Sequence, residues 1–413
     1  MSTGNLFRNP VAFLIWAVGD VYFIASVLIS LLFAILAPNM QQQLQLTNAQ
    51  LGLLGAVFFL SYAVAQFFAG RLFDHYQPRY ILSGSALMAS GGLMLLAGAS
   101  NFFIVVMAKL LIGIGLSTAY VGVIYLAKTW FTAQQFTLLC GITQMSSNVT
   151  AALVVLGLAI SGIWLNFRTI IGILAILIFL IASVMIIVIR SAPTRPLSPQ
   201  QAPVRIWQDL AKLARIRQFW LGAVYFGASF SVLLALSDLW NIPTQLAYRH
   251  SQDTAAILNA MFPLGGGFGA IAASGLSHYF RCPATIARCY SSAMLGLTLV
   301  LVYGPEFSTS MTSLLIFGLG FAFGGAILGF PLVSQYLPVY LVGTGFGLMA
   351  TIAYLWSALL QYLVGILLGD QAVTAGIVAI HAFQWALTPL VITLLIGWLV
   401  SYALNNRNVS PKI

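Results

Sequence analysis

Apolar segments of about 20 residues recur along the whole chain, and this feature limits the fold more than any other. A helix needs about 20 apolar residues to cross a bilayer. We predict twelve membrane spans, at Val11–Ala37, Gln50–Gly70, Ile81–Ala99, Phe102–Ala127, Phe136–Ile160, Thr169–Ile189, Trp220–Ile242, Thr254–Leu276, Ala284–Tyr303, Ser310–Tyr336, Leu341–Leu368 and Val373–Ala403. Twelve such spans use roughly 240 of the 413 residues. The loops must therefore be short, and little room remains for a domain outside the membrane.

The composition agrees with an all-α polytopic membrane protein. Hydrophobic residues make up 61% of the chain and charged residues only 6%, whereas about a quarter of an ordinary soluble protein is charged. These values exclude a soluble globular enzyme, a disordered regulator and a nucleic-acid-binding protein. The net charge of +10 rests on only 17 Lys and Arg residues, so their placement matters more than their sum.

The basic residues predict the orientation, because Lys and Arg concentrate in cytoplasmic loops. With the N-terminus inside, 14 of the 17 basic residues lie in inner segments. Only Arg168 and Arg249 lie in outer loops, and Lys109 lies within a span. We expect both termini to be cytoplasmic. The short loops, and the absence of glycosylation sequons from the outer ones, favour a bacterial inner membrane.

The residues that enzymes use for chemistry are scarce. Three cysteines show no paired spacing, and Glu306 is the single glutamate. The sequence contains no H-E-x-x-H motif, no G-x-S-x-G motif and no phosphate-binding loop. Glycine runs such as Gly265–Gly269 lie in apolar spans and predict close helix packing instead. We therefore expect no metal, no cofactor and no enzyme activity.

A polar stretch, Arg190–Phe219, divides the chain into two halves of six spans. The predicted units are an N-terminal bundle at residues 1–189, a cytoplasmic linker at 190–219 and a C-terminal bundle at 220–413. Four prolines in Ser191–Pro203 prevent a regular helix there. Farther on, one helical face carries Ile206, Trp207, Leu210, Leu213 and Ala214. Such a basic amphipathic helix is typical of the inner leaflet surface, with a calmodulin-type target as the alternative.

The segment after the second span carries a family resemblance. Gly70–Tyr80 resembles the inner-loop signature G-x-L-x-D-R-x-G-R-R of the major facilitator superfamily. The matching residues are Gly70, Leu72, Asp74 and Arg79, while His75 and Gln77 depart from the signature. A degenerate copy of the signature, Ser274–Arg281, follows the eighth span. Lys109–Gly115 resembles the fourth-span motif R-x-x-x-G-x-G, with Lys in place of Arg. The resemblance implies twelve helices in two pseudo-symmetric six-helix bundles, which bind a small-molecule substrate between them.

The resemblance also implies a conformational latch at the inner side. In the family, the acid of this signature contacts the start of the eleventh span, here near Gly343–Gly345, where the helix dipole favours an anion. The latch residues would be Gly70, Asp74, Arg79 and Lys128. A plain salt bridge between Asp74 and Arg79 or Lys128 is the alternative.

Three ionisable residues lie within the predicted spans, where a charge costs at least a few kcal/mol. Asp20 is a coupling candidate, or else an interfacial charge near the inner surface. Asp238 lies five residues before Pro243, which weakens the seventh span. Lys109 is a candidate contact for an anionic substrate. Alternatively, it pairs with an acid or snorkels to the outer interface.

Polar and aromatic residues of other spans are further candidates for a substrate cavity, and for each of them an interhelical hydrogen bond is the equal alternative. They are Tyr22, Ser26, Gln144, Asn148, Tyr225, Trp240, Asn241, Tyr354 and Gln361.

Together these features predict a monomeric secondary transporter in the lipid bilayer. We expect proton-coupled uptake of a small polar metabolite, such as an organic anion or amino acid, by alternating access. The fifth span lacks the Gly-Pro run usual in drug-exporting relatives, which favours uptake. The alternative is an exporter or antiporter of a larger molecule, such as a siderophore or drug. A transporter-like sensor would need an added cytoplasmic domain, for which we expect no room.

Overall fold

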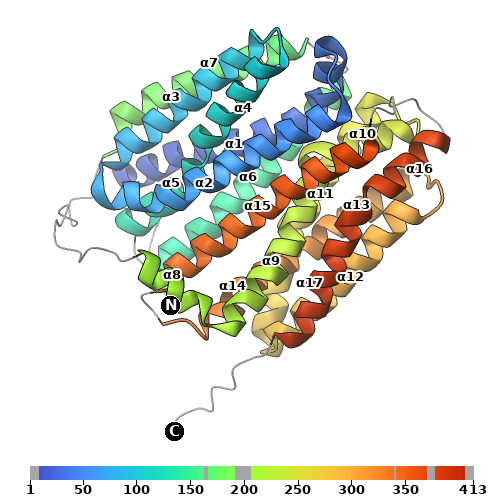
Figure 1. The fold of residues 1–413 in the computed structure, drawn as a ribbon. Helices are drawn as coiled ribbons and strands as arrows, with labels where there is room; N and C mark the ends of the chain where they lie inside the picture. Colours follow the sequence, from blue (N-terminus) through green and yellow to red (C-terminus); the bar gives the residue numbers. More distant parts are fainter. Residues whose placement is uncertain are drawn as a thin grey trace. The chain divides into compact units, whose positions relative to one another are not determined.

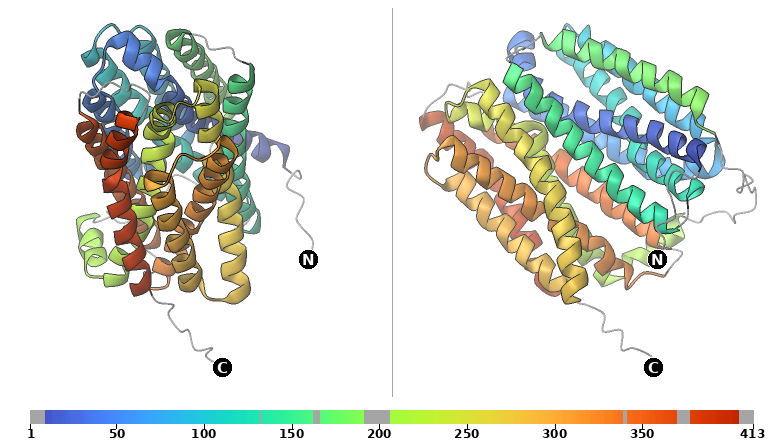
Figure 2. Two further views of the ribbon diagram at one scale, coloured as in Figure 1. Left: turned by 90° about the vertical axis from the view of Figure 1, so that its right-hand side faces the viewer. Right: turned by 180° about the vertical axis from the view of Figure 1, so that it is seen from behind.

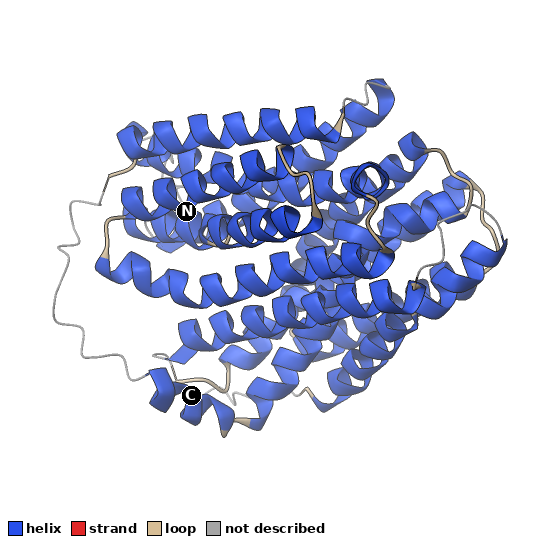
Figure 3. Cartoon of the chain, turned by 45° about the horizontal axis from the view of Figure 1, so that its top comes forward, coloured by secondary structure: helices blue, strands red, loops and turns tan. Residues whose placement is uncertain are grey.

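The fold was analysed in a computed structural model, which describes residues 9–131, 133–161, 166–190, 206–338, 341–369 and 377–404. Within these ranges the chain forms helices joined by short turns and contains no strand (Figure 3). Contacts divide the chain into two units. The first comprises Met1–Leu46 and Val57–Ala202, and the second comprises Thr47–Ala56 and Pro203–Ile413.

The first unit contains the helices of the first six spans (Figure 1). They are α1 (Pro10–Leu44), α2 (Asn48–His75, from Val57 onward), α3 (Pro78–Ala97), α4 (Phe102–Leu116), α5 (Thr118–Trp130), α6 (Ala133–Ser161) and α7 (Phe167–Val188). Asparagine side chains begin three of these helices: Asn9, Asn101 and Asn166 each accept a backbone N–H of the first turn. Such caps satisfy donors that have no partner within the helix.

The second unit contains the helices after the linker, together with the first turns of α2. They are α8 (Ile206–Ala214), α9 (Arg217–Ala235), the π-helical turn η2 (Leu236–Trp240), α10 (Asn241–Ala247), α11 (Gln252–Phe280), α12 (Pro283–Tyr303), α13 (Thr309–Phe323), the 3-10 turn η3 (Gly324–Leu328), α14 (Gly329–Ser334), α15 (Val342–Leu368), α16 (Ile377–Ala386) and α17 (Thr388–Ala403).

The described residues contain 11 helices that are long and apolar enough to cross a membrane, and a shorter apolar helix at Ile142–Leu158. These twelve match the predicted spans one to one. The predicted ends were less accurate. The first helix continues past Pro38 to Leu44, and the seventh span continues through Pro243 to Ala247. The signature after the second span is still helical as far as His75.

Glycines let α11 and α13 approach closely (Figure 2). A side chain at Gly265 of α11 would overlap the backbone of Phe317, and one at Gly320 of α13 would overlap the backbone of Phe262. The prediction that glycine runs serve helix packing is therefore confirmed for this pair. It is wrong for Gly267 of the same run, where an added Cβ would meet no atom within 4 Å.

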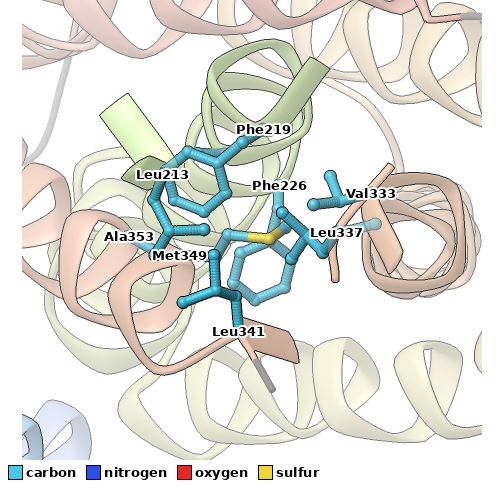
Figure 4. Packing of buried hydrophobic residues seen from close by; sticks show 10 residues of the cluster. Leu213, Phe219, Phe226, Val333, Leu337, Leu341, Met349 and Ala353 are labelled. Atoms are coloured by element: carbon cyan, nitrogen blue, oxygen red, sulfur yellow. The ribbon is translucent and has the colours of Figure 1, made fainter. Parts of the chain in front are cut away.

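A hydrophobic cluster of the second unit joins α8, α9, η3, α14 and α15 (Figure 4). Leu213 of α8 is fully buried, and it packs with Phe219, Leu341 and Met349. The Trp220 indole N–H also donates 3.0 Å to the carbonyl of Ala214. The expectation that this face of α8 lies on the leaflet surface is thus wrong at Leu213, because protein core offers it closer packing than lipid headgroups.

Candidate functional site

Four predicted site residues meet at a wide turn of the seventh span. The turn η2 is π-helical, with the Asn241 N–H bonded to the carbonyl of Leu236, five residues back. Asp238 and Asn241 are buried, at 8% and 4% exposure. π-helical turns are rare and frequently lie at functional sites. Pro243 has no N–H to give to the preceding turn, so it favours a departure from α-helical bonding here.

The polar groups of this turn are bonded within the second unit. The Ser237 hydroxyl donates 2.7 Å to the Asp238 carboxylate. The Trp240 indole N–H donates 3.1 Å to the carbonyl of Gln361 on α15, and the Gln361 amide donates 3.3 Å to the carbonyl of Leu234. The structure therefore brings Asp238, Trp240, Asn241 and Gln361 into one cluster.

Asp20 forms a second polar group, in the first unit. It lies ten residues after the start of α1, or about 15 Å along the helix. Its side chain is buried within the protein, at 6% exposure. The Ser146 hydroxyl of α6 donates 2.9 Å to Asp20 Oδ2. The other carboxylate oxygen has no hydrogen-bond partner, and neither has the buried Thr143 hydroxyl one turn before Ser146.

Lys109 is held among aromatic rings of the same unit. Its ammonium lies over the Phe33 ring and 5.4 Å from the centre of the Phe58 ring. The residue is 4% exposed, so snorkelling to the surface is not observed. Phe33 lies 13 residues beyond Asp20 on α1, about 20 Å along the helix. Asp20 itself accepts the Ser146 hydroxyl of α6. Aromatic faces stabilise a desolvated cation there.

Two of the three predicted tyrosines form hydrogen bonds inside their own units. The Tyr22 hydroxyl donates 2.8 Å to the carbonyl of Gly115, and the Tyr225 hydroxyl donates 2.8 Å to the carbonyl of Gly325. Both side chains are almost completely buried. The Ser26 hydroxyl donates to the carbonyl of Phe23 in its own helix. For each of these three residues, the structure shows the alternative to substrate contact, which is a hydrogen bond between helices or within one helix.

The remaining candidates are less enclosed. Gln144 is exposed on α6, and Asn148 is partly buried one turn later. Tyr354 packs edge-on against Phe230, with 5.3 Å between ring centres. For these three residues, ligand contact stays a prediction.

The predicted latch lies mostly outside the described side chains. The side chain of Asp74 and the residues Gly70 and Gly343 lie outside what the structure describes in detail. Arg79 is described: its guanidinium donates to the Tyr80 hydroxyl and lies 4.5 Å from that ring centre. Lys128 is exposed near the end of α5. The latch stays a prediction.

Sequence reasoning missed several residues of both clusters. Asn259 of α11 is fully buried and bonds to the π-helical turn. Gln245, Ser146 and Thr143 were also overlooked. An asparagine within an apolar span was the available signal for Asn259, because buried amides in membranes need partners. Ser and Thr gave no signal, since they commonly bond to their own helix backbone.

Comparisons with known proteins agree with this architecture. The family model described as Major Facilitator Superfamily matches residues 21–361. No curated protein matches the chain. Among solved structures, a bacterial homologue of the human lysosomal transporter Spinster, inward-facing and occupied, is 14% identical with a TM-score of 0.72 and covers 96% of each chain.

Two further structures are similar over nearly their whole length. The nucleoside transporter NupG is 13% identical, with a TM-score of 0.75 and coverage of 94% of this chain and 99% of that one. A D-xylose-proton symporter is 14% identical, with a TM-score of 0.67 and coverage of 95% and 97%. At such identities the likeness shows the fold alone.

The family match spans most of the chain. The apolar helices show that the chain is a multi-pass membrane protein. It is a transporter rather than an enzyme. The chain belongs to the major facilitator superfamily.

Proposed function

We propose that this transporter takes up a small polar metabolite, such as an organic anion or amino acid, by proton-coupled alternating access across the inner membrane. The sequence has no nucleotide-binding motif, so the driving force must be a gradient or exchange. We also propose cytoplasmic termini, a linker at residues 190–219 and a monomeric state. The basic residues of the inner segments support this orientation.

The observation that carries the coupling proposal is the bonding of Asp20. One carboxylate oxygen accepts from Ser146, and the other has no hydrogen-bond partner although the residue is buried. A carboxylate buried in this way is costly unless its charge is matched or neutralised. A carboxyl group whose surroundings alternate between protein interior and water can bind and release a proton. Asp238 is the second candidate, in the second unit.

The substrate class rests on the polar side chains of both units. Lys109 adds a positive charge to the first unit, and the second adds buried amides and an indole N–H. Similar structures are those of a nucleoside transporter and a D-xylose-proton symporter. Their substrates are small and polar, which supports a polar substrate here, and the second supports proton coupling.

The test uses purified protein in proteoliposomes on a solid-supported membrane. Pools of organic acids, amino acids, pentoses and nucleosides are applied with and without an inward proton gradient. We expect a gradient-dependent current with an organic-acid or amino-acid pool. A current only with a sugar or nucleoside pool would contradict the proposed substrate class. No current with any pool would contradict uptake and favour export of a larger molecule.

Asparagine variants locate the coupling residue. We expect Asp20→Asn to abolish gradient-driven accumulation while exchange of substrate continues, because exchange needs no net proton transfer. Asp253→Asn, at the outer start of α11, is the matched control and should behave as wild type. Unchanged proton-driven transport in both Asp20→Asn and Asp238→Asn would show that neither residue couples transport to protons.

The latch is tested separately. We propose that Asp74 stabilises the outward-facing state. Asp74→Asn should then change the transport rate and shift the conformational equilibrium toward the inward-facing state, as read by cysteine accessibility from the inner side. If rate and accessibility both match wild type, Asp74 forms only a loop salt bridge.

A further inference from the structure

Two side-chain amides from other helices hold the π-helical turn of the seventh span. The Asn259 Nδ2 group of α11 donates 2.8 Å to the carbonyl of Ser237. The Gln361 Nε2 group of α15 donates 3.3 Å to the carbonyl of Leu234. Both amides are almost completely buried. A change from α- to π-helical bonding disturbs the regular pairing of backbone carbonyls, and a buried carbonyl without a donor costs about 1–3 kcal/mol. The two amides supply donors at this change.

Asn259 also belongs to a chain of amides that runs along the turn. Its Oδ1 atom accepts 3.0 Å from Asn241 Nδ2, and Asn241 Oδ1 accepts 3.2 Å from Gln245 Nε2. Each bond here runs from an amide nitrogen to an amide or carbonyl oxygen, so the direction of every bond in the chain is consistent. The side chain of Asn241 is thereby held by bonds at both ends of its amide group.

Gln361 is oriented by its surroundings as well. Its own carbonyl accepts the Trp240 indole N–H at 3.1 Å. Its Oε1 atom has no hydrogen-bond partner and lies where a side chain at Gly55 would stand. Gly55 belongs to the first turns of α2, which are part of the second unit. The absence of a side chain at Gly55 is thus a condition for the observed position of the Gln361 amide.

We propose that Asn259 is a positioning residue for substrate binding: with Gln361, it holds the seventh span in π-helical register, so that Asp238 and Asn241 are presented as the binding groups. If the turn returns to α-helical bonding, residues on one side of it rotate by about 100° relative to the other. Asn259 is fully buried, and its amide nitrogen and oxygen both bond to the seventh span. The proposal rests on the proposed function, in which the buried amides of this unit support a polar substrate and Asp238 is the second coupling candidate.

Transport kinetics give the first test. We expect Asn259→Leu to raise the KM for the substrate about tenfold while kcat changes less than about threefold. Gly55→Ala should raise KM in the same direction, because the added methyl group displaces the Gln361 amide. Asn48→Leu is the matched control: it removes another buried amide bond of this unit, 3.1 Å from Asn48 Nδ2 to the carbonyl of Gly369. We expect it to lower stability and leave KM unchanged.

Hydrogen exchange gives a second test, which needs no substrate and so separates this inference from the proposed function. Peptides that cover Leu236–Thr244 should exchange faster in Asn259→Leu than in wild type and Asn48→Leu. Asn259→Asp keeps the volume and the acceptor, and it removes the donor to Ser237, so it serves if Asn259→Leu does not fold. Unchanged exchange in a folded variant would overturn the proposal, and so would equal KM changes in Asn259→Leu and Asn48→Leu.

Discussion

The hydroxyl of Tyr22 donates its hydrogen bond to the carbonyl of Gly115, which lies two residues before the break between α4 and α5 at Ser117. Tyr225 makes the corresponding bond in the other unit, to Gly325 within the 3-10 turn of the tenth span. The first and fourth spans correspond to the seventh and tenth in a six-plus-six repeat. In each unit, a tyrosine thus supplies a donor where regular helical bonding is interrupted.

Removal of either hydroxyl should therefore destabilise its unit. We expect Tyr22→Phe and Tyr225→Phe each to lower the free energy of unfolding by about 0.5–2 kcal/mol, because a buried carbonyl loses its donor. Denaturant unfolding in detergent measures the effect. Tyr279→Phe, at a side chain that is 80% exposed, is the control and should change little. A weaker substrate affinity at unchanged stability would instead identify Tyr22 as a substrate contact.

The glycines of α11 give a prediction with an internal control. Gly265→Ala should destabilise the protein by about 1–3 kcal/mol, since the methyl group would overlap the Phe317 carbonyl and force the helices apart. At Gly267 nothing lies within 4 Å of an added Cβ. Gly267→Ala should stabilise α11 by up to about 1 kcal/mol through helix propensity. Thermal unfolding of the two variants tests this, and equal shifts would contradict the packing explanation.

The spans were predictable from sequence because each must bury about 20 apolar residues in lipid, whatever its neighbours are. The exact positions and types of the breaks in helical bonding within these spans were not predictable. Ser117 carries no strong breaking signal. Pro243 indicated a weakened seventh span but not the type of turn, and the predicted limit at Ile242 was too early, since helical bonding continues to Ala247. Charges within spans, such as Asp20 and Lys109, were found because ionisable groups are conspicuous there. The partners Ser146 and Asn259 depend on which helix faces which, and helix pairing leaves no local pattern in the sequence.

Lys109 should govern the preference for substrate charge. Lys109→Met keeps most of the side-chain length and removes the ammonium, so we expect transport of an anionic substrate to fall at least tenfold, or about 1.4 kcal/mol. Lys109→Arg keeps the charge and the contact with aromatic faces, and should retain more of the activity. Uptake assays with an anionic substrate and its neutral amide compare the variants. An equal loss for both substrates in Lys109→Met would assign Lys109 to packing with Phe33.

His250, in the loop between α10 and α11, should make stability depend on pH. Burial lowers the pKa of His250 below its ordinary value of 6.5, and the charge of Glu306 opposes this shift. Burial also raises the pKa of the neighbouring Tyr248. Because the folded state disfavours protonated His250, the unfolded state binds more protons as the pH falls through the ordinary value. Stability should therefore be highest above about pH 6.5 and decrease below it.

Thermal unfolding between about pH 7 and pH 5 tests this titration, in the range where an ordinary histidine changes charge. We expect the melting temperature of His250→Gln to depend less on pH than that of wild type. Glu306→Gln should make the dependence steeper, because it removes the negative charge that favours protonated His250. If His250→Gln follows the wild-type curve, another group is responsible. If Glu306→Gln flattens the curve, the glutamate rather than the buried imidazole dominates the response of this loop.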